Sequence, residues 1–163
     1  FFLLVMSISP QNSLLAWINS LDGVDAVEDV SGLRDGRAFV TTMRAIAPDH
    51  AEMIDAEDTS AGEDGEKTLA AVVRCLISFY EDVLQQQVDA DGFDYASMAR
   101  GEDVDGLLRV TTLLLGAAVQ CEAKGTYIQG IMEMDQETQS HLMHVVRGIM
   151  GGGHDTEDEE EEE

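Results

Sequence analysis

The segment LLRVTTLLLGAAVQCEAKGTYIQGIMEMDQETQSHLMHVVRGIM, residues 107–150, decides how this chain folds. Its first part, 107–121, is apolar on almost every side of a helix. Its last part, 135–150, carries more apolar surface than one contact with a core requires. A helix with surplus apolar surface is either buried on several sides or binds a partner. The sequence therefore predicts a central buried helix followed by a last helix whose spare face needs an explanation.

The rest of the chain has the same helical periodicity, and no stretch alternates as a strand would. Ser9-Pro10 is a typical helix start, Pro48 marks a helix end, and Gly125 is expected to break or bend the central helix. Asp135 is expected to cap the last helix. We therefore predict an all-α fold. Its expected parts are an N-terminal extension over 1–8, one domain over 9–150 with an acidic loop within 49–66, a long helix over 66–87, short helical pieces over 95–100 and 126–134, and a disordered glycine-rich and acidic tail over 151–163.

The net charge is −24, from 33 acidic and 9 basic residues. The tail contributes eight acids, so the body keeps 25 acids against 9 bases, a net −16. Such a surface repels phosphate backbones, which argues against nucleic-acid binding. The apolar segment 1–6 is too short to span a bilayer and lacks a basic flank, so no membrane insertion is expected. Cys75 and Cys121 lie in apolar helical patterns and are expected to be buried free thiols in a reducing compartment.

Candidate sites for chemistry are weak. The run Asp89-Ala-Asp91-Gly92-Phe93-Asp94 suggests a calcium loop, but an EF-hand register needs glycine at Asp94 and glutamate at Arg100. His141 and His144 could form half of a metal site, although the sequence suggests no third ligand. No phosphate-binding glycine loop, nucleophile elbow or Cys-x-x-Cys pair is present. We therefore expect neither an enzyme nor a resident cofactor or metal.

The last helix has two apolar stripes when its residues are placed at about 100° intervals. Leu142, Val145 and Ile149 form the stripe expected to dock on the domain. The adjacent stripe consists of Gln139, Met143, Val146 and Met150. Methionine side chains adapt to an incoming side chain, so this second stripe could bind an amphipathic helix. The alternative is that both stripes belong to the core.

Two groups of residues resemble a known family. LLAWIN at 14–19, together with GLRDGRAF at 32–39 and IAP at 46–48, resembles the opening helix and signature loop of calponin-homology-type folds. GAAVQCE at 116–122, YIQ at 127–129, IM at 131–132 and the whole of 135–150 resemble the Hook domain, the N-terminal module of Hook adaptor proteins, which is related to the N-terminal domains of Girdin-type proteins and NuMA. The resemblance implies a calponin-homology-like domain of about seven helices with an extra C-terminal helix.

The Hook resemblance also implies a partner. In that family the extra helix helps bind a short helix of the dynein light intermediate chain, and a glutamine and an isoleucine seven residues apart are important. Gln139 matches the glutamine, and Val146 stands at the second position. Partner-helix binding is accordingly expected at Gln139, Met143, Val146 and Met150.

The same resemblance implies a cytoplasmic, cytoskeleton-associated adaptor for microtubule-based transport that links dynein and dynactin to cargo. Its parent protein is expected to be a coiled-coil homodimer. Two other functions stay open at this point. One is an actin- or microtubule-binding calponin-homology module, which the acidic charge opposes. The other is a scaffold whose last helix is wholly buried and whose partner lies elsewhere.

Overall fold

The computed structural model describes residues 10–56, 65–88 and 92–150, and within these ranges the chain is helical with no strand. This confirms the predicted all-α fold. Ser9, the acidic loop 57–64, Asp89 to Asp91 and the tail lie outside the described residues. The elements follow the order α2 (Pro10–Asn19), η1 (Val30–Leu33), α3 (Arg37–Ile46), α4 (Pro48–Ala56), α5 (Gly65–Phe79), η2 (Tyr80–Leu84), α6 (Tyr95–Ala99), α7 (Val104–Ala118), α8 (Lys124–Met132) and α9 (Gln136–Met150).

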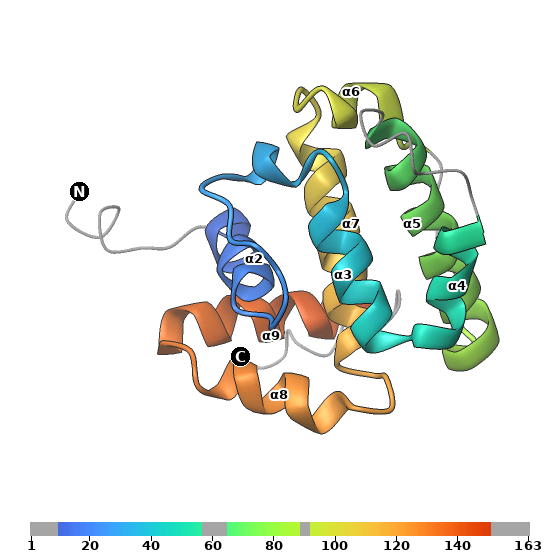
Figure 1. Cartoon of the computed structure of the whole chain (residues 1–163). Helices are drawn as coiled ribbons and strands as arrows, with labels where there is room; N and C mark the ends of the chain where they lie inside the picture. Colours follow the sequence, from blue (N-terminus) through green and yellow to red (C-terminus); the bar gives the residue numbers. More distant parts are fainter. Residues whose placement is uncertain (1–9, 57–64, 89–91, 151–163) are drawn as a thin grey trace.

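Helix α7 is the centre of the domain. It runs through the middle of Figure 1 and contacts α2, α3, α5, α6, α9 and η1. Leu107, Val110 and Leu114 are fully buried, as are the small residues at 117 and 118. Full burial of one apolar helix by several neighbours supplies much of the hydrophobic stabilisation of a domain this size. The prediction of a central helix is confirmed.

The N-terminal half packs on α7 through short helices separated by tight turns. Pro48 begins α4, where its missing N–H costs nothing, rather than only ending α3. Gly36 precedes α3 with a φ of 77°, and a Cβ there would come within 2.7 Å of Thr68 Cγ2. Glycine is therefore required in this turn both for its conformation and for the close approach of α5. The single-turn helix η1 was not predicted from the sequence.

Helix α5 continues into a π-helical turn, η2, instead of remaining α-helical to 87 as predicted. Gln85 ends the turn in the left-handed conformation, with φ 56° and ψ 42°, and Gln86 N donates to Tyr80 O over 2.8 Å. At the junction of α5 and η2, Phe79 and Tyr80 contact each other edge-on, with ring centres 6.4 Å apart, and each lines a different surface hollow. π turns are frequent at functional sites.

Replacing Gln85 by glycine should raise the free energy of unfolding by about 0.5–1 kcal/mol, because glycine adopts the left-handed conformation without steric cost. Gln87→Gly is the matched control, since Gln85 is the one non-glycine residue with positive φ in the described part of the chain. That control should destabilise slightly. Urea denaturation of both variants measures the difference, and a Gln85→Gly variant that is less stable than the wild type would contradict the assigned backbone strain.

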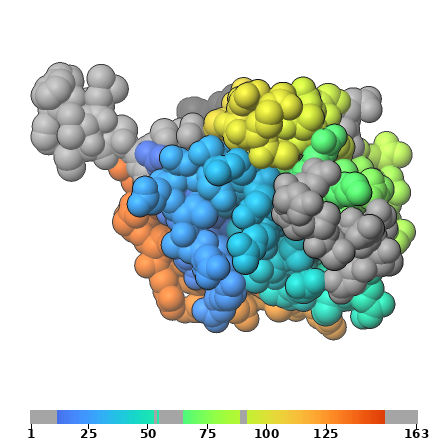
Figure 2. All heavy atoms as spheres, turned by 45° about the horizontal axis from the view of Figure 1, so that its top comes forward, coloured from blue at the N-terminus to red at the C-terminus, as the bar shows by residue number. Residues whose placement is uncertain are grey.

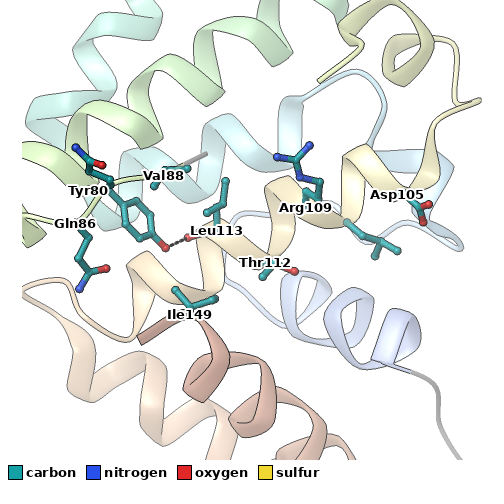
Figure 3. A pocket seen from close by; sticks show the side chains of 10 residues that line it. Tyr80, Gln86, Val88, Asp105, Arg109, Thr112, Leu113 and Ile149 are labelled. Atoms are coloured by element: carbon teal, nitrogen blue, oxygen red, sulfur yellow. Dashed lines mark hydrogen bonds between the residues drawn. The ribbon is translucent and has the colours of Figure 1, made fainter. Parts of the chain in front are cut away.

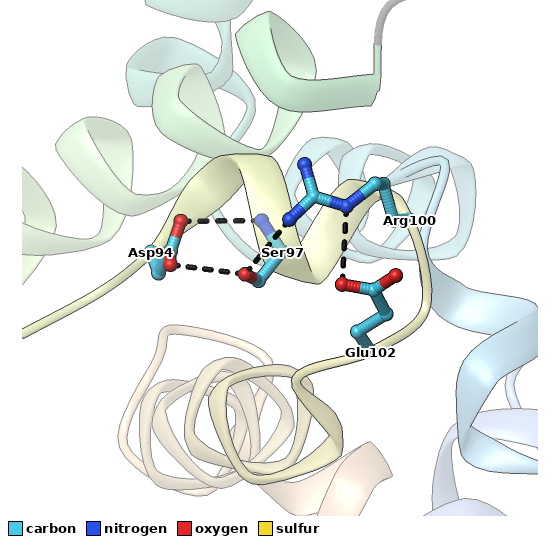
Figure 4. A network of polar contacts seen from close by, with 4 residues as sticks. All are labelled: Asp94, Ser97, Arg100 and Glu102. Carbon is cyan, nitrogen blue, oxygen red and sulfur yellow. Dashed lines mark hydrogen bonds and ion pairs between the residues drawn. The ribbon is translucent and has the colours of Figure 1, made fainter.

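Helix α6 packs on α5 and α7, and a small polar network within residues 94–102 caps it and the turn that follows (Figure 4). The Asp94 carboxylate accepts from Ser97 N at 3.2 Å and from Ser97 Oγ at 2.9 Å, which caps the helix. These hydrogen bonds lower the pKa of Asp94. Arg100 donates to Ser97 Oγ and to Glu102. In Figure 2 this segment lies beside the η1–α3 region, although the two are far apart in sequence.

The chain turns twice after α7, first into α8 and then into α9. The predicted break at Gly125 is wrong, because α7 ends at Ala118 and Gly125 lies inside α8. The turn occurs earlier, where Val119 N and Gln120 N bond to carbonyls at the end of α7. Asp135 caps α9 as predicted: its carboxylate accepts from Thr138 Oγ1 at 2.8 Å and from Thr138 N at 3.2 Å. Both hydrogen bonds lower the pKa of Asp135.

Candidate partner-helix groove

Helix α9 docks on α2 and α7 through a face centred on Leu142. Leu142 is fully buried, Thr138 is 2% exposed and Val146 is 4% exposed. These three residues follow one another at intervals of four, which places them on a single side of the helix. Val145 and Ile149 are half-buried on one flank of this face, and Met143 is half-buried on the other.

The predicted site residues therefore occupy different environments. Met143 is half-buried and packs on the edge of the core. Val146 belongs to the docked face, so the expectation that it points outward is wrong: the buried arc of α9 is centred closer to Val146 than the stripe pattern indicated. Met150 ends the helix, and its side chain lies outside the described residues.

Gln139 is half-buried and used within the chain. Its Nε2 donates to Met132 O at 3.0 Å and to Met134 O at 2.9 Å. These carbonyls belong to the end of α8 and the turn after it, where helix geometry leaves acceptors without intrahelical donors. Gln139 thus ties α8 to α9 and fixes the start of the last helix.

An open groove with a volume of about 730 Å³ lies between η2, α7 and the end of α9 (Figure 3). Ile149 forms the wall that belongs to α9, and Leu108, Thr112 and Leu113 form the wall that belongs to α7. The full lining consists of Tyr80, Gln86, Gln87, Val88, Asp105, Leu108, Arg109, Thr112, Leu113 and Ile149. A groove of this size, with apolar side chains from α7 and α9 and polar side chains between them, suits a partner that presents both apolar and polar groups.

The floor of the groove is rigidly built. Tyr80 is 1% exposed and its hydroxyl donates to Leu113 O over 2.7 Å. Burial raises the pKa of Tyr80, so the phenol stays neutral and keeps this bond. Gly116 lies directly beneath: a Cβ there would come within 2.5 Å of the Tyr80 hydroxyl and 3.0 Å of Ile149 Cδ1. Because Gly116 has no side chain, Ile149 can pack closely on α7 at this point and hold α9 against it.

Polar residues define the two ends of the groove. At one end the Arg109 guanidinium lies 4.0 Å from the centre of the Phe93 ring, which itself stacks on Tyr95. At the other end Gln86 Nε2 donates to Gln120 Oε1 at 3.0 Å. Stacking and hydrogen bonding both limit side-chain motion, so the groove is largely formed before any partner arrives.

The sequence contained a signal for this groove that the stripe analysis did not use. Asp105, Arg109 and Thr112 share one side of an otherwise apolar central helix, at spacings of four and three. This side faces the groove. Tyr80 and Val88 carried no such signal, because their positions depend on the π turn.

The remaining candidate groups have structural roles. Cys75 and Cys121 are buried free thiols, as predicted, and burial raises the pKa of Cys75 to about 11. His141 Nδ1 lies 2.9 Å from Ser13 Oγ and links α9 to α2. In the described residues no three His, Cys, Asp or Glu side chains are arranged to hold a metal ion. The helices described here include none that is both long and apolar enough to cross a bilayer.

Comparison with known proteins gives consistent matches. A family model described as the HOOK domain matches residues 9–148. A "Protein Hook homolog" of Branchiostoma floridae is 31% identical over 143 residues, covering 84% of this chain and 20% of that protein. "Protein Hook homolog 3" of Homo sapiens is 26% identical over 144 residues, covering 85% of this chain and 20% of that protein. The solution structure of the conserved domain of mouse HOOK1 superposes with a TM-score of 0.73 at 23% identity, covering 89% of this chain and 92% of that one.

Proposed function

Because this chain belongs to the Hook-domain family, we propose that it binds a short amphipathic helix of the dynein light intermediate chain in the groove beside α9. The chain spans about a fifth of the length of the curated relatives it matches. The role of the whole protein is therefore part of the proposal. It would be a coiled-coil dimer in the cytoplasm, associated with the cytoskeleton, and it would connect dynein and dynactin to cargo.

One observation carries the proposal: an open groove of about 730 Å³, lined by apolar and polar side chains, adjoins the helix that distinguishes Hook domains from other calponin-homology folds. Leu108, Leu113 and Ile149 offer apolar contacts to the anchors of an incoming helix. Arg109 and Asp105 at one end could fix its direction through charged groups. Burial of a few leucine or aromatic anchors supports micromolar affinity after the cost of ordering the partner is subtracted.

In this proposal the residues of α9 differ in whether a partner can reach them. Met143 and Ile149 reach the surface with α9 docked as it is. Val146 is buried at 4% exposure, so a direct contact between Val146 and the partner requires α9 to move away from α7. Gln139 acts first by holding α8 and α9 together, and its amide oxygen can accept a hydrogen bond from the partner.

Leu108→Ser should weaken binding of a fluorescent light-intermediate-chain helix by about tenfold, or roughly 1.4 kcal/mol, because it removes an apolar contact from the α7 wall of the groove. Met132→Ser also replaces a large apolar side chain by serine, but on α8 and away from the groove, so it should leave the affinity within about twofold. Fluorescence anisotropy measures both, and circular dichroism checks that both variants stay folded. Equal affinity for wild type and Leu108→Ser would contradict the assigned groove.

The competing filament-binding function makes a different prediction. The body of the domain has a net charge of −16, and filament surfaces are themselves acidic. We expect no more than background amounts of the domain to pellet with actin or microtubules at low salt. Strong co-sedimentation would favour the calponin-homology filament module over the motor adaptor.

A further inference from the structure

Three large apolar side chains are exposed in the described part of the chain, and none of them faces the groove beside α9. Val83 is 52% exposed on η2, while Ile128 and Met132 are 37% and 57% exposed on α8. Lys124, Ile128 and Met132 follow at intervals of four, so they form one stripe along α8. Ile131 is fully buried, so the side of α8 next to this stripe packs inward. In Figure 1, α8 lies at the lower edge of the molecule.

The stripe leads into a second hollow. This hollow has a volume of about 510 Å³ and lies between the start of α4, the α5–η2 junction and the start of α8. Phe79 lies against its inner side at 4% exposure and is held edge-to-face by His50, with ring centres 5.6 Å apart. Val83 stands at the opening, and Lys124 belongs to both the hollow and the α8 stripe. A partner side chain could therefore enter the hollow while the rest of the partner follows α8.

This surface is separate from the groove described above. Tyr80 lines the groove, whereas Phe79 and Val83 line the hollow. The hydrogen bond between Gln86, which lines the groove, and Gln120, which lines the hollow, joins the two walls. The two linings share no residue, so a side chain bound in one site leaves the lining of the other free.

The charges around the second surface indicate the chemistry of its partner. Asp49 and Glu122 are exposed and line the hollow, and Asp82 is exposed nearby, where its carboxylate lies 3.3 Å from His50 Nε2. Lys124 is the one lysine or arginine among the side chains that line this hollow. A second copy of the domain would add its own −16 charge and be repelled. A partner with basic residues flanking its apolar anchors is complementary to this rim.

We propose that the surface formed by Val83, the Phe79 hollow and the Ile128–Met132 stripe binds a basic amphipathic helix of another protein. One apolar or aromatic anchor of that helix fills the hollow, and smaller apolar residues pack along α8. Gly125 lies on the exposed side of α8 near Ile128 and Met132, and a Cβ there would meet nothing within 4 Å. This leaves room for the partner's backbone to approach closely.

The test uses a synthetic amphipathic helix of leucine and lysine, about 18 residues or roughly 27 Å long, with one tryptophan in its apolar face. Titration into the full ¹⁵N-labelled chain should shift the amide signals of Val83, Lys124, Ile128 and Met132. Val83→Ser and Met132→Ser should each lower the affinity for the peptide by about fivefold, since hydrophobic contacts are lost. Leu108→Ser, which should impair binding of the light-intermediate-chain helix, should leave binding of this peptide unchanged.

A counterpart peptide with glutamate in place of lysine should bind at least tenfold more weakly, and added salt should weaken the lysine peptide. The proposal is overturned if Val83→Ser and Met132→Ser both bind the lysine peptide as the wild type does, or if the glutamate peptide binds equally well. Signal changes confined to the groove beside α9 would also overturn it. None of these results bears on the light-intermediate-chain titration, so failure of either proposal can be recognised separately.

Discussion

Replacing Val146 with aspartate should lower the free energy of unfolding by about 3 kcal/mol or more and release α9 from the domain. Val146 is 4% exposed and belongs to the apolar core, so the new carboxylate would be buried without a partner. The same substitution at an outward-facing position would weaken partner binding without changing stability. The stability of this variant therefore shows whether Val146 is buried against the core or exposed at the surface.

Thermal and urea denaturation measure the effect, with His144→Asp as the control. His144 is exposed on the same helix, so that variant should change stability by less than about 1 kcal/mol. A stable, native-like Val146→Asp domain that has lost only its partner would show that α9 lies differently from the docked arrangement described here.

Adding a single methyl group at Gly116 should destabilise the domain by about 1–3 kcal/mol and disturb the groove. A Cβ at this position would come within 2.5 Å of the Tyr80 hydroxyl and 3.0–3.1 Å of two Ile149 carbons. Overpacking of this kind forces side chains and backbone apart. We expect the Tyr80–Leu113 hydrogen bond and the packing of Ile149 against α7 to be lost together. The partner helix should then bind more weakly.

Gly130→Ala is the matched control, because a Cβ at Gly130 meets nothing within 4 Å. It should stabilise the domain by about 0.5–1 kcal/mol through the higher helix propensity of alanine. If Gly116→Ala were as stable as Gly130→Ala, the close packing of α7, η2 and α9 at this point would be contradicted.

The sequence predicted those features that depend on local patterns. A helix apolar on all sides must be buried, which placed α7 at the centre. Asp135 before a helical run was correctly expected to cap α9 because a cap acts within one turn. The Hook resemblance, carried by residues in the last third of the chain, led to the family that the comparisons confirm.

The features that were missed depend on tertiary contacts. The π turn at η2 falls within a stretch whose apolar residues keep a regular α-helical spacing, so no local sequence pattern predicts it. The border between docked and exposed faces of α9 was misplaced because α9 packs against both α2 and α7, which buries Val146 as well as Leu142. Gln139 is predicted as a partner contact, and in the structure its amide nitrogen bonds to carbonyls at the end of α8 and in the α8–α9 turn. The groove walls come from three segments that are distant in sequence.

The most direct test of the central claim is an NMR titration of the ¹⁵N-labelled domain with the light-intermediate-chain helix. The groove proposal predicts that the largest changes in amide signals occur in α9 and on the α7 wall at Leu108, Thr112 and Leu113, with Ile149 among them. The signals of Ile128 and Met132 on the outer side of α8 should change little. Saturable binding whose signal changes avoid α9 and that α7 wall, or no binding at all, would contradict the claim.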